Sequence, residues 1–517
     1  MKFLSRFVVV TVIVVARALA SNWYITQSGA GSLNGTSVGN AWAVGSQTWG
    51  GAGIVAGDTV HLDGTFTSAF TISGSGSSGN PITILFDSGA NFSVPAWAVS
   101  GAVILSGRSY VTINGDVTGG RQGLIQSTAN GTGLSNQVNS VGVILTNCSN
   151  ITVENLTVSP MYVRTVGTDQ NNYGVCVYCL GNNGSGISSI TVNNCTLTDA
   201  TGGFYFVPNG ACSNITYSNC TSYNCNWCGV CSGSGSSANT IVGMYVYGNR
   251  FSNWTNWDDT SGADTFHHNG FFTFATAGST ADTVYYYNNI IGPNYSLNGG
   301  GVNKSTSGLF IQFGVTNARA YNNLFLTNGS GDNPSTGFIY FNPEGNLVST
   351  YLIANNTFVG GGTGIGINFS PDTFSVGGTQ TLKDENNLFQ NVDTAVAVFY
   401  SGTTSLTCTN NLGYGGLGNA FKYSTNGSAG GISIATWQSE TGQDANFSTS
   451  NPLLNSANIP SSSSPCRAGG TNATLASVPL DLSNRPRPPT PSIGAYEYYQ
   501  TALSALAPGR GVVVGGP

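Results

Sequence analysis

The densest group of residues that could do chemistry lies between positions 253 and 270. This segment reads Asn-Trp-Thr-Asn-Trp-Asp-Asp-Thr-Ser-Gly-Ala-Asp-Thr-Phe-His-His-Asn-Gly, and it holds two of the three histidines and two of the eight tryptophans. Carboxylates grouped in this way can bind a calcium ion, and imidazole and ammonium groups can act as general acids or bases. The predicted metal ligands are Asp258, Asp259 and Asp264. The predicted catalytic residues are Asp264, His267, His268 and Lys304.

Each of these residues also has a structural alternative. Aspartate favours turns because it bonds its own backbone. His267 and His268 are adjacent, so in an extended chain they point to opposite sides and one of them can be a packed, hydrogen-bonded histidine. Lys304 follows an asparagine in a glycine-rich loop, where it can simply be solvated. Trp254 and Trp257 can either pack in a core or present their rings to a ligand.

A repeat runs through the chain and predicts how these residues are positioned. Short apolar strands that begin at glycine recur from residue 101 to residue 364, at spacings of 26 to 41 residues. An asparagine or asparagine pair follows each of them between two further short strands. These asparagines form a predicted column, whose members are Asn155, Asn194, Asn219, Asn249, Asn289, Asn323, Asn356, Asn387 and Asn411. Periods of 20 to 50 residues indicate a solenoid or a propeller, in which each unit buries its apolar side against the next.

Three strands per unit with a sharp corner at asparagine favour a parallel β-helix over a propeller, whose blades have four antiparallel strands. Asparagine suits the corner because it tolerates the left-handed backbone conformation, and stacked amides can bond from turn to turn. The loops at 253–270 and around Lys304 occupy equivalent positions on consecutive turns. We therefore expect their side chains to lie within one or two strand spacings of each other.

Composition agrees with an all-β protein. Only 7% of the 517 residues are charged, 72 are glycine and 40% are hydrophobic. A helix-rich protein is excluded because strong helix formers are scarce, and disorder is excluded because there is ample apolar surface to bury. The net charge of −6 argues against nucleic acid or an anionic membrane as a partner.

The ends of the chain differ from its repetitive centre. Residues 1–20 read as an export signal, with Lys2 and Arg6 before an apolar run too short to span a bilayer. We therefore expect a secreted protein, periplasmic or on the outer surface if the host is bacterial, with no membrane insertion. We expect the chain to divide into a signal peptide at 1–20, an N-terminal cap and first turns at 21–100, a parallel β-helix core at 101–414, a C-terminal cap at 415–500 and a flexible tail at 501–517.

Cysteines are concentrated in one stretch. Nine of the 11 lie between Cys148 and Cys231, including Cys176-x-x-Cys179 and Cys225-x-x-Cys228-x-x-Cys231. Such spacing suits a zinc or iron–sulfur site. The alternative is that these side chains are stacked in the interior of neighbouring strands, with some of them paired as disulfides after export. We favour the interior position because the cysteines fall within strand-like repeats.

The asparagine column and the three-strand unit resemble the right-handed parallel β-helix superfamily of pectate lyases and their relatives. The stretch from Tyr24 to Thr65, with Gly57-Asp-Thr-Val-His61-Leu, is similar to the opening of secreted chondroitinase B-like and alginate lyase-like proteins. The tail from Asp481 to Glu497 resembles the closing segment of bacterial members. The resemblance covers nearly the whole mature chain and implies a single right-handed β-helix of about ten turns, capped at both ends, with the substrate groove beside the loop that precedes the first strand of each turn.

The resemblance also implies a secreted enzyme with a polysaccharide substrate, and a polysaccharide lyase is the expected activity. In β-elimination on a uronate glycan, calcium on the aspartates would neutralise the carboxylate, and Lys304 or a histidine would remove the proton. The expected substrate-binding residues are Trp254, Trp257, Arg319 and Glu344. Two alternatives remain: a glycoside hydrolase using two of the carboxylates, and a non-catalytic glycan-binding or adhesive protein. We expect a monomer.

Overall fold

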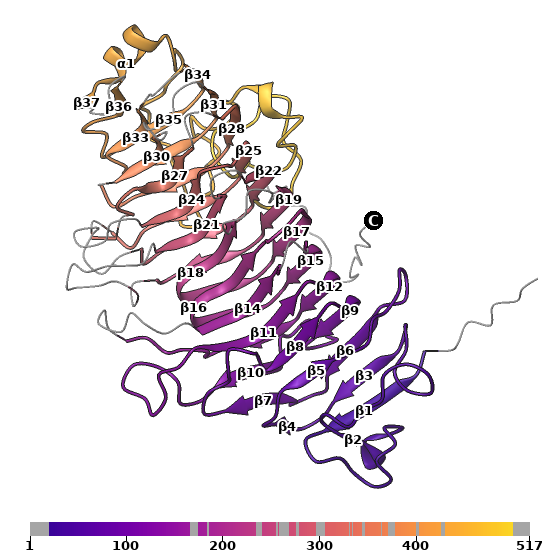
Figure 1. The fold of residues 1–517 in the computed structure, drawn as a ribbon. Coiled ribbons are helices and arrows are strands. Elements are labelled where there is room, and N and C mark those ends of the chain that lie inside the picture. The colour runs from indigo at the N-terminus through magenta and orange to yellow at the C-terminus, as the bar shows by residue number, and fades with distance from the viewer. Residues whose placement is uncertain are drawn as a thin grey trace, which may run out of the picture.

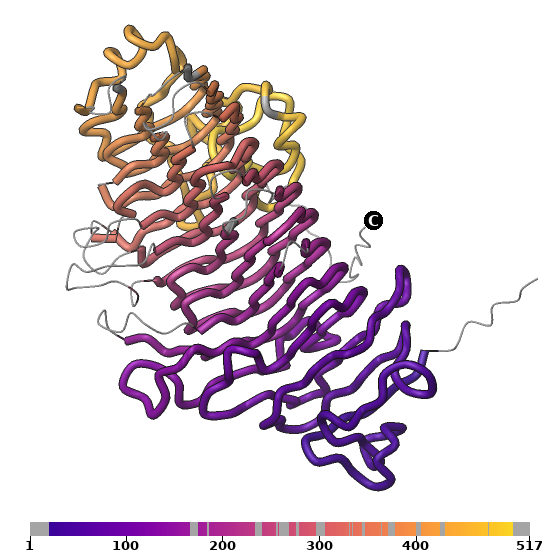
Figure 2. The backbone as a smooth tube through the Cα atoms, in the orientation of Figure 1, coloured from indigo at the N-terminus to yellow at the C-terminus, as the bar shows by residue number. Residues whose placement is uncertain are grey.

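The chain forms one long stack of coils in the computed structural model (Figure 1). The structure describes residues 20–165, 174–182, 186–233, 240–254, 257, 268–275, 279–295, 306–329, 331–332, 334–343, 347–362, 364–370, 378–399, 403–424 and 430–499. The smooth trace shows the coils following one another from the N-terminal to the C-terminal end (Figure 2). From residue 59 onward, each coil contributes to three ladders, which we name ladder A, ladder B and ladder C; ladder A has two further strands that precede this residue.

Ladder A is a 14-stranded parallel sheet. Its strands, in spatial order, are β2 (Trp42–Ala43), β1 (Asn22–Thr26), β3 (Thr59–Leu62), β6 (Ile82–Phe86), β9 (Ser109–Asn114), β12 (Ser149–Glu154), β15 (Ser188–Asn193), β17 (Cys212–Ser218), β19 (Thr240–Tyr247), β22 (Thr280–Tyr287), β25 (Asn317–Tyr321), β28 (Ser349–Ala354), β31 (Thr379–Glu385) and β34 (Thr403–Thr409).

Ladders B and C follow ladder A in every coil and are joined into one sheet at two places. The strands of ladder B are β4 (Thr65–Phe66), β7 (Asn91–Val94), β10 (Gly123–Ser127), β13 (Leu156–Val158), β16 (Thr196–Val207), β18 (Thr221–Gly233), β20 (Arg250–Ser252), β23 (Ile290–Ile291), β26 (Leu324–Leu326), β29 (Thr357–Val359), β32 (Leu388–Gln390) and β35 (Leu412–Tyr414).

Ladder C shares the second halves of β16 and β18. Its other strands are β5 (Phe70–Ile72), β8 (Val103–Ser106), β11 (Ser140–Thr146), β14 (Gly174–Leu180), β21 (Asn269–Ala275), β24 (Ser307–Gln312), β27 (Gly337–Asn342), β30 (Ile365–Phe369), β33 (Thr394–Phe399) and β36 (Phe421–Ser424). Only the final pair, β36 with β37 (Gly431–Ile432), is antiparallel among the named strands. The predicted all-β parallel β-helix with three strands per coil is confirmed.

The corner between ladders A and B has two adjacent positions, which in the later coils are both asparagine and differ in backbone conformation and burial. The first residue of the corner has a left-handed backbone, as at Asn288, where φ is 56°, and at Asn322, where φ is 53°. The second residue points inward and is fully buried, as at Asn289 and Asn323. The predicted column therefore mixes two positions, because Asn155, Asn194 and Asn219 are left-handed corner residues, whereas the later members are inward ones. In coils with a single asparagine the sequence does not distinguish the two positions.

The inward asparagines form a continuous hydrogen-bonded array, which we call the inner ladder. It contains Asn249, Asn289, Asn323, Asn356, Asn387 and Asn411. In the first four of these, the side-chain Nδ2 donates to Oδ1 of the next member at 3.0–3.1 Å. Each member also donates to a carbonyl of ladder A, as Asn323 does to Tyr286 at 2.9 Å. Buried amides stacked in this way satisfy one another and fix the register of the coils.

Replacing Asn323 with alanine is expected to lower the free energy of unfolding by about 3 kcal/mol, because the main-chain and side-chain donors of Asn289 and the Tyr286 carbonyl would lose their buried partners. Chemical denaturation would measure the loss. The matched control is Asn446→Ala in an exposed turn, which is expected to change stability by less than about 0.5 kcal/mol. Equal effects of the two substitutions would contradict a stabilising role for the array.

The left-handed corner asparagines hold the C-terminal segment, which turns back along the stack. This segment is yellow in Figure 1 and lies beside β22 to β31. Nδ2 of Asn322, Asn355, Asn386 and Asn410 donates to the carbonyls of Leu480, Ser492, Thr471 and Gly469, respectively. The segment thereby covers the A–B corner of the last coils. It follows the only α-helix in the described part of the chain, α1 (Ile434–Thr441), and contains the short 3-10 helix η3 (Asn472–Thr474); a second one, η1 (Val38–Asn40), lies near the N-terminus.

All eleven cysteines are buried, and none forms a disulfide. Seven of them lie in strands, as do Cys176 and Cys179 of β14, and the other four lie between strands or in the C-terminal segment, at Cys148, Cys195, Cys220 and Cys466. Burial raises the pKa of the thiols at Cys228 and Cys231, so they stay protonated and unreactive. No three of these sulfurs come within metal-ligand distance in the described residues. The predicted interior position is confirmed, and the predicted disulfides are absent.

None of the described helices has the length and apolar character needed to cross a bilayer.

Candidate functional site

The outer face of ladder C carries a row of aromatic side chains. Strand alternation produces it: in β14, Val177 and Cys179 point into the core, whereas Tyr178 between them points outward. Parallel pairing in register then aligns Tyr178 with Tyr205 of β16, with ring centroids 5.3 Å apart. Trp227 of β18 lies next to Tyr205 at 5.9 Å. Three rings from three coils thus adjoin on one surface.

The row continues toward the C-terminus but becomes less accessible. Phe272, Phe310 and Tyr340 follow in register and stack at 4.6 and 4.7 Å. Phe272 and Phe310 are only 6% and 2% exposed. Together with Val230 they form an apolar cluster separate from the interior core. Tyr178, Tyr205 and Trp227 at one end of the row and Tyr340 at the other are partly exposed.

The rings of Tyr178, Tyr205 and Trp227 line a hollow of about 310 Å³. Its remaining lining residues are Val99, Asn139, Ser140, Val141, Val175 and Thr201. None of the described residues that line it is charged, and their polar groups are amides and hydroxyls. The hollow can bind an apolar or ring-shaped surface by packing and orient it with hydrogen bonds. The described part of its lining contains no acid or base.

A local feature of the backbone keeps this part of the face open. β16 and β18 run without interruption from ladder B into ladder C, and each bends at one left-handed residue, Asp199 at φ 50° and Asn224 at φ 54°. No loop rises from the corner in these two coils. The corner is fixed by hydrogen bonds to the Asp199 carboxylate, from Asn224 Nδ2 at 3.1 Å and from the Thr198 hydroxyl at 3.0 Å.

Three of the predicted site residues lie together near this corner, but inside the protein. His268 is 0% exposed, and its Nδ1 lies 2.6 Å from Oδ1 of Asn226. Trp254 and Trp257 are 0% and 1% exposed. Trp257 donates through Nε1 to the Asn224 carbonyl at 3.1 Å, and the Arg164 guanidinium lies 4.8 Å from the centre of its ring. All three side chains are therefore buried, and none of them presents a surface to a ligand.

The other predicted catalytic and metal-binding residues lie outside the described residues. They are Asp258, Asp259, Asp264, His267 and Lys304, together with the predicted substrate-binding residue Glu344. Their convergence remains a prediction. Arg319 is described, but it lies on ladder A and is therefore not brought together with His268 on ladder C. The hollow lined by Tyr178, Tyr205 and Trp227, which we call the aromatic hollow, was not predicted from the sequence. The alternation of Tyr178 with two apolar residues could have indicated an outward-facing ring.

One group of potential metal ligands exists in the described part of the chain, and it does not suit calcium. Asp384, Cys408 and Asp444 bring their ligand atoms within 4.8 Å of one another in the interior. Calcium requires six to eight oxygen ligands, whereas this group offers a thiol and two carboxylates. Those carboxylates already accept hydrogen bonds from Asn387, Asn411 and Trp437.

No protein-family model and no curated protein matches the sequence. Comparison with solved structures finds similar chains at low identity. Pectate lyase Pel9A has 16% identity, with 94% of this chain and 98% of that chain covered and a TM-score of 0.39. XylC in complex with xylose has 9% identity, coverage of 93% and 98% and a TM-score of 0.40. The native GH136 lacto-N-biosidase from Eubacterium ramulus has 12% identity, coverage of 75% and 68% and a TM-score of 0.40.

At this level of similarity we transfer no function from these proteins. The assignment of the fold depends instead on the three parallel ladders and the inner asparagine array of the chain itself. On that ground the chain is a parallel β-helix protein.

Proposed function

We propose that this chain is a secreted polysaccharide-active enzyme that binds a glycan along the outer face of ladder C. The observation that carries the proposal is the uncharged hollow lined by Tyr178, Tyr205 and Trp227. The C–H groups on one side of a sugar ring carry partial positive charge and pack against the negative face of an aromatic ring. Amide and hydroxyl groups at Asn139, Ser140 and Thr201 can bond sugar hydroxyls. The three coils present these groups in sequence along the stack, as a chain-like ligand requires.

The chemistry we propose is β-elimination on a uronate-containing glycan. Because the described residues that line the hollow are uncharged, we assign the acid and the base to loops of the stack outside them. The sequence places Asp258, Asp259, Asp264, His267 and Lys304 in such loops. In this proposal Lys304 or His267 removes the proton alpha to the carboxylate, and calcium on the aspartates supplies the neutralising charge.

Two other functions use the same face. A glycoside hydrolase would need two carboxylates on either side of the scissile bond, and the aspartates of the 253–270 segment supply enough of them. A non-catalytic glycan-binding protein is favoured by the absence of charge among the residues lining the described hollow. The signal-like residues 1–20 are consistent with export in all three cases.

Incubation with a panel of acidic and neutral polysaccharides, with calcium or with a chelator, would separate these functions. A lyase produces an ultraviolet-absorbing unsaturated sugar and new reducing ends, and chelation should abolish both signals. Reducing ends without absorbance would indicate a hydrolase. Retardation of the protein in a polysaccharide-containing gel, with neither product, would indicate a binding protein. No product and no retardation with any polysaccharide would refute the proposal.

Replacing Trp227 with alanine is expected to weaken glycan binding about 10-fold, because the ring supplies one wall of the hollow and such aromatic contacts contribute about 1 kcal/mol or more. Affinity electrophoresis on the polysaccharide identified by the panel would measure this loss. Tyr223→Ala is the matched control, since Tyr223 is a 36% exposed aromatic residue of the same strand but lies in its ladder B half. Equal retardation of both variants would show that the ligand binds elsewhere.

A further inference from the structure

The outer face of ladder A carries a second, differently built site. Pairing in register produces two side-by-side columns of outward side chains. The first column contains Tyr245, Tyr285, Arg319, Leu352 and Lys383, and the second contains Tyr247, Tyr287, Tyr321, Ala354 and Glu385. Both columns change character after the tyrosines: the first acquires two cations, and the second acquires a carboxylate.

A hollow of about 200 Å³ lies where the columns change. Arg319, Lys383 and Glu385 line it from the stack, and Ala473 and Ser477 of the C-terminal segment form the opposite wall. The small side chain of Ala354 separates Tyr321 from Glu385 in the second column. The opposite wall is anchored beside Glu385, because Asn386 and Thr471 exchange two hydrogen bonds at 2.8 and 2.9 Å.

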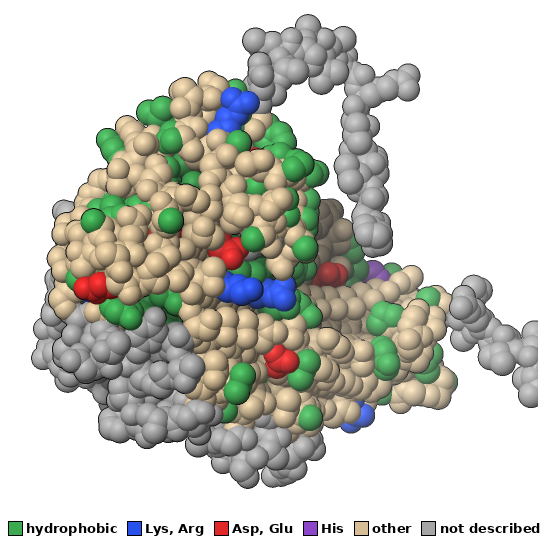
Figure 3. Space-filling model, turned by 90° about the horizontal axis from the view of Figure 1, so that it is seen from above, with side chains coloured by type: hydrophobic (Ala, Val, Ile, Leu, Met, Phe, Trp, Pro, Cys, Tyr) green, Lys and Arg blue, Asp and Glu red, His purple; other side chains and the backbone are tan. Residues whose placement is uncertain are grey.

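Arg319 is held in place, and neither cation forms an ion pair among the described residues. The Arg319 guanidinium lies 4.8 Å from the centre of the Tyr285 ring, an arrangement that holds a cation without cancelling its charge. Lys383 is two strands away in the same column, at a distance of about 10 Å from the strand spacing. In the part of the chain that the structure describes, neither residue makes an ion pair. The space-filling view from above shows few charged side chains on this surface (Figure 3). Lys or Arg side chains lie together near its centre.

Glu385 gives this hollow a buried, unused hydrogen-bonding atom. The residue is only 5% exposed, and its Oε2 has no hydrogen-bond partner among the described residues. Burial raises the pKa of its carboxyl group, and Lys383 opposes that shift. A buried polar atom without a partner is unusual because it costs about 1–3 kcal/mol. A ligand hydroxyl in the hollow would satisfy it.

We propose that this hollow binds an acidic sugar residue, with Arg319 and Lys383 holding its carboxylate or sulfate group and Glu385 accepting a hydrogen bond from one of its hydroxyls. Its volume lies below the roughly 300–1,000 Å³ of sites for drug-sized ligands, so the occupant is a single ring. The site is on ladder A, whereas the aromatic hollow is on ladder C. It therefore binds its ligand independently of the proposed enzymatic function.

To test the site, the binding of small ligands to the full chain is measured by ligand-observed NMR titration. The ligands are glucuronate, glucose 6-sulfate, glucose, acetate and inorganic sulfate. We expect at least one of the two acidic sugars to bind at least about 10-fold more tightly than glucose, acetate and inorganic sulfate, since a charge-assisted hydrogen bond contributes about that factor. Which acidic sugar binds identifies the anionic group. Equal binding of glucose, or tighter binding of inorganic sulfate than of either sugar, would refute the proposal.

Variants locate the binding. Arg319→Met and Lys383→Met are each expected to weaken binding of the acidic sugar about 10-fold, and Glu385→Ala to reduce the preference for glucuronate over acetate. The side chains of Arg319 and Lys383 reach solvent, so their replacement should leave the fold intact, and circular dichroism checks this. Lys422→Met on β36 and Trp227→Ala on β18 should leave the affinity unchanged. If Lys422→Met weakened binding as much as Arg319→Met, the effect would be one of overall charge and the site would be rejected. Loss of activity or glycan binding in Trp227→Ala with intact acidic-sugar binding would separate the two hollows.

Discussion

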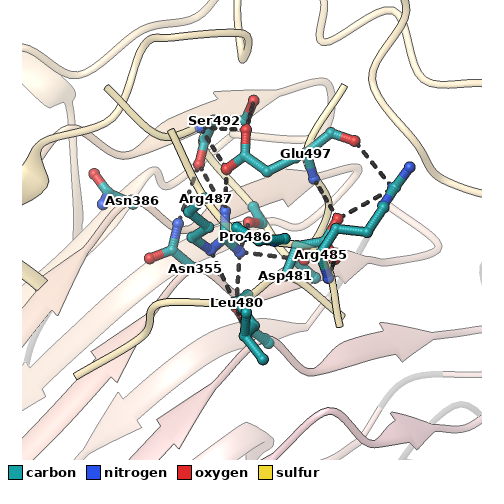
Figure 4. A network of polar contacts seen from close by, with 12 residues as sticks. Asn355, Asn386, Leu480, Asp481, Arg485, Pro486, Arg487, Ser492 and Glu497 are labelled. Atoms are coloured by element: carbon teal, nitrogen blue, oxygen red, sulfur yellow. Dashed lines mark hydrogen bonds and ion pairs between the residues drawn. The ribbon is translucent and has the colours of Figure 1, made fainter. Parts of the chain in front are cut away.

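Replacement of Arg487 with methionine is expected to destabilise the attachment of the C-terminal segment by about 3–5 kcal/mol. The Arg487 side chain is fully buried and forms an ion pair with Glu497, which is itself 2% exposed. Arg487 also donates to Oδ1 of Asn322 at 2.7 Å, and this hydrogen bond joins the C-terminal segment to a corner of the stack. Figure 4 shows this network between the segment and the corner asparagines. Removing the guanidinium would leave the Glu497 carboxylate buried without its counter-ion.

Limited proteolysis and hydrogen exchange would report the effect, because the segment would open more often and become cleavable after the last coil. Arg467→Met is the control, since Arg467 lies in the same segment but is exposed; its guanidinium lies over the Tyr498 ring and donates to the Ser462 carbonyl. The double variant Arg487→Met, Glu497→Leu should regain part of the lost stability because no charge is then left unpaired. Equal protection of Arg487→Met and Arg467→Met would contradict a role for the buried pair.

The second large effect we expect is a fall in stability as the pH rises from about 4 to about 7. Asp384 and Asp444 lie together in the interior, and neither forms an ion pair with a described residue. Burial raises the pKa of Asp444 to about 7 and that of Asp384 in the same direction. In the unfolded chain both groups ionise near their ordinary pKa of 3.8. Between these values the folded state binds more protons than the unfolded state, so raising the pH favours unfolding. A shift of about three units corresponds to about 4 kcal/mol.

Denaturation of the wild type at several pH values between 4 and 9 should therefore show a decline that levels off above the folded pKa. Asp444→Asn should flatten the profile, so that the variant exceeds the wild type in stability at pH 8 and approaches it at pH 4.5. Asp63→Asn, at a partly exposed aspartate near the N-terminus, should leave the wild-type profile unchanged. A wild-type profile that rises between pH 4 and 7 would show that the pair is held as two carboxylates.

The fold could be predicted from the sequence because the repeated residues each have one structural role that explains their position. Glycine-initiated apolar strands and asparagine corners recur in each coil, and the coil geometry follows from them. The two asparagine positions could not be separated where only one asparagine is present, because adjacent residues of a corner differ only in backbone angle and direction. Asn219 and Asn249 illustrate this, since one is a left-handed corner residue and the other a buried member of the array.

The site was harder to predict, because binding surfaces depend on which coils lie side by side and on which face each residue points. Charge density singled out the 253–270 segment, yet Trp254, Trp257 and His268 are buried there. Arg319 was recognised as a candidate, but its partners Lys383 and Glu385 are more than 60 positions away and become neighbours only through two strand pairings. Uncharged binding residues such as Tyr178 look like ordinary strand residues in a sequence.

The inner asparagine array has a polarity. Every amide from Asn249 to Asn356 directs its N–H group toward the C-terminal end and its oxygen toward the N-terminal end, so the amide dipoles add instead of cancelling. At the N-terminal end the buried Oδ1 of Asn249 has no preceding asparagine side chain in the array, and it accepts from the main-chain N–H of Cys220 instead. At the other end Asn411 presents N–H groups to Asp384 and Asp444. The two acids thus terminate the series as hydrogen-bond acceptors, and lengthening the stack beyond them would require moving this acceptor pair to the new last coil.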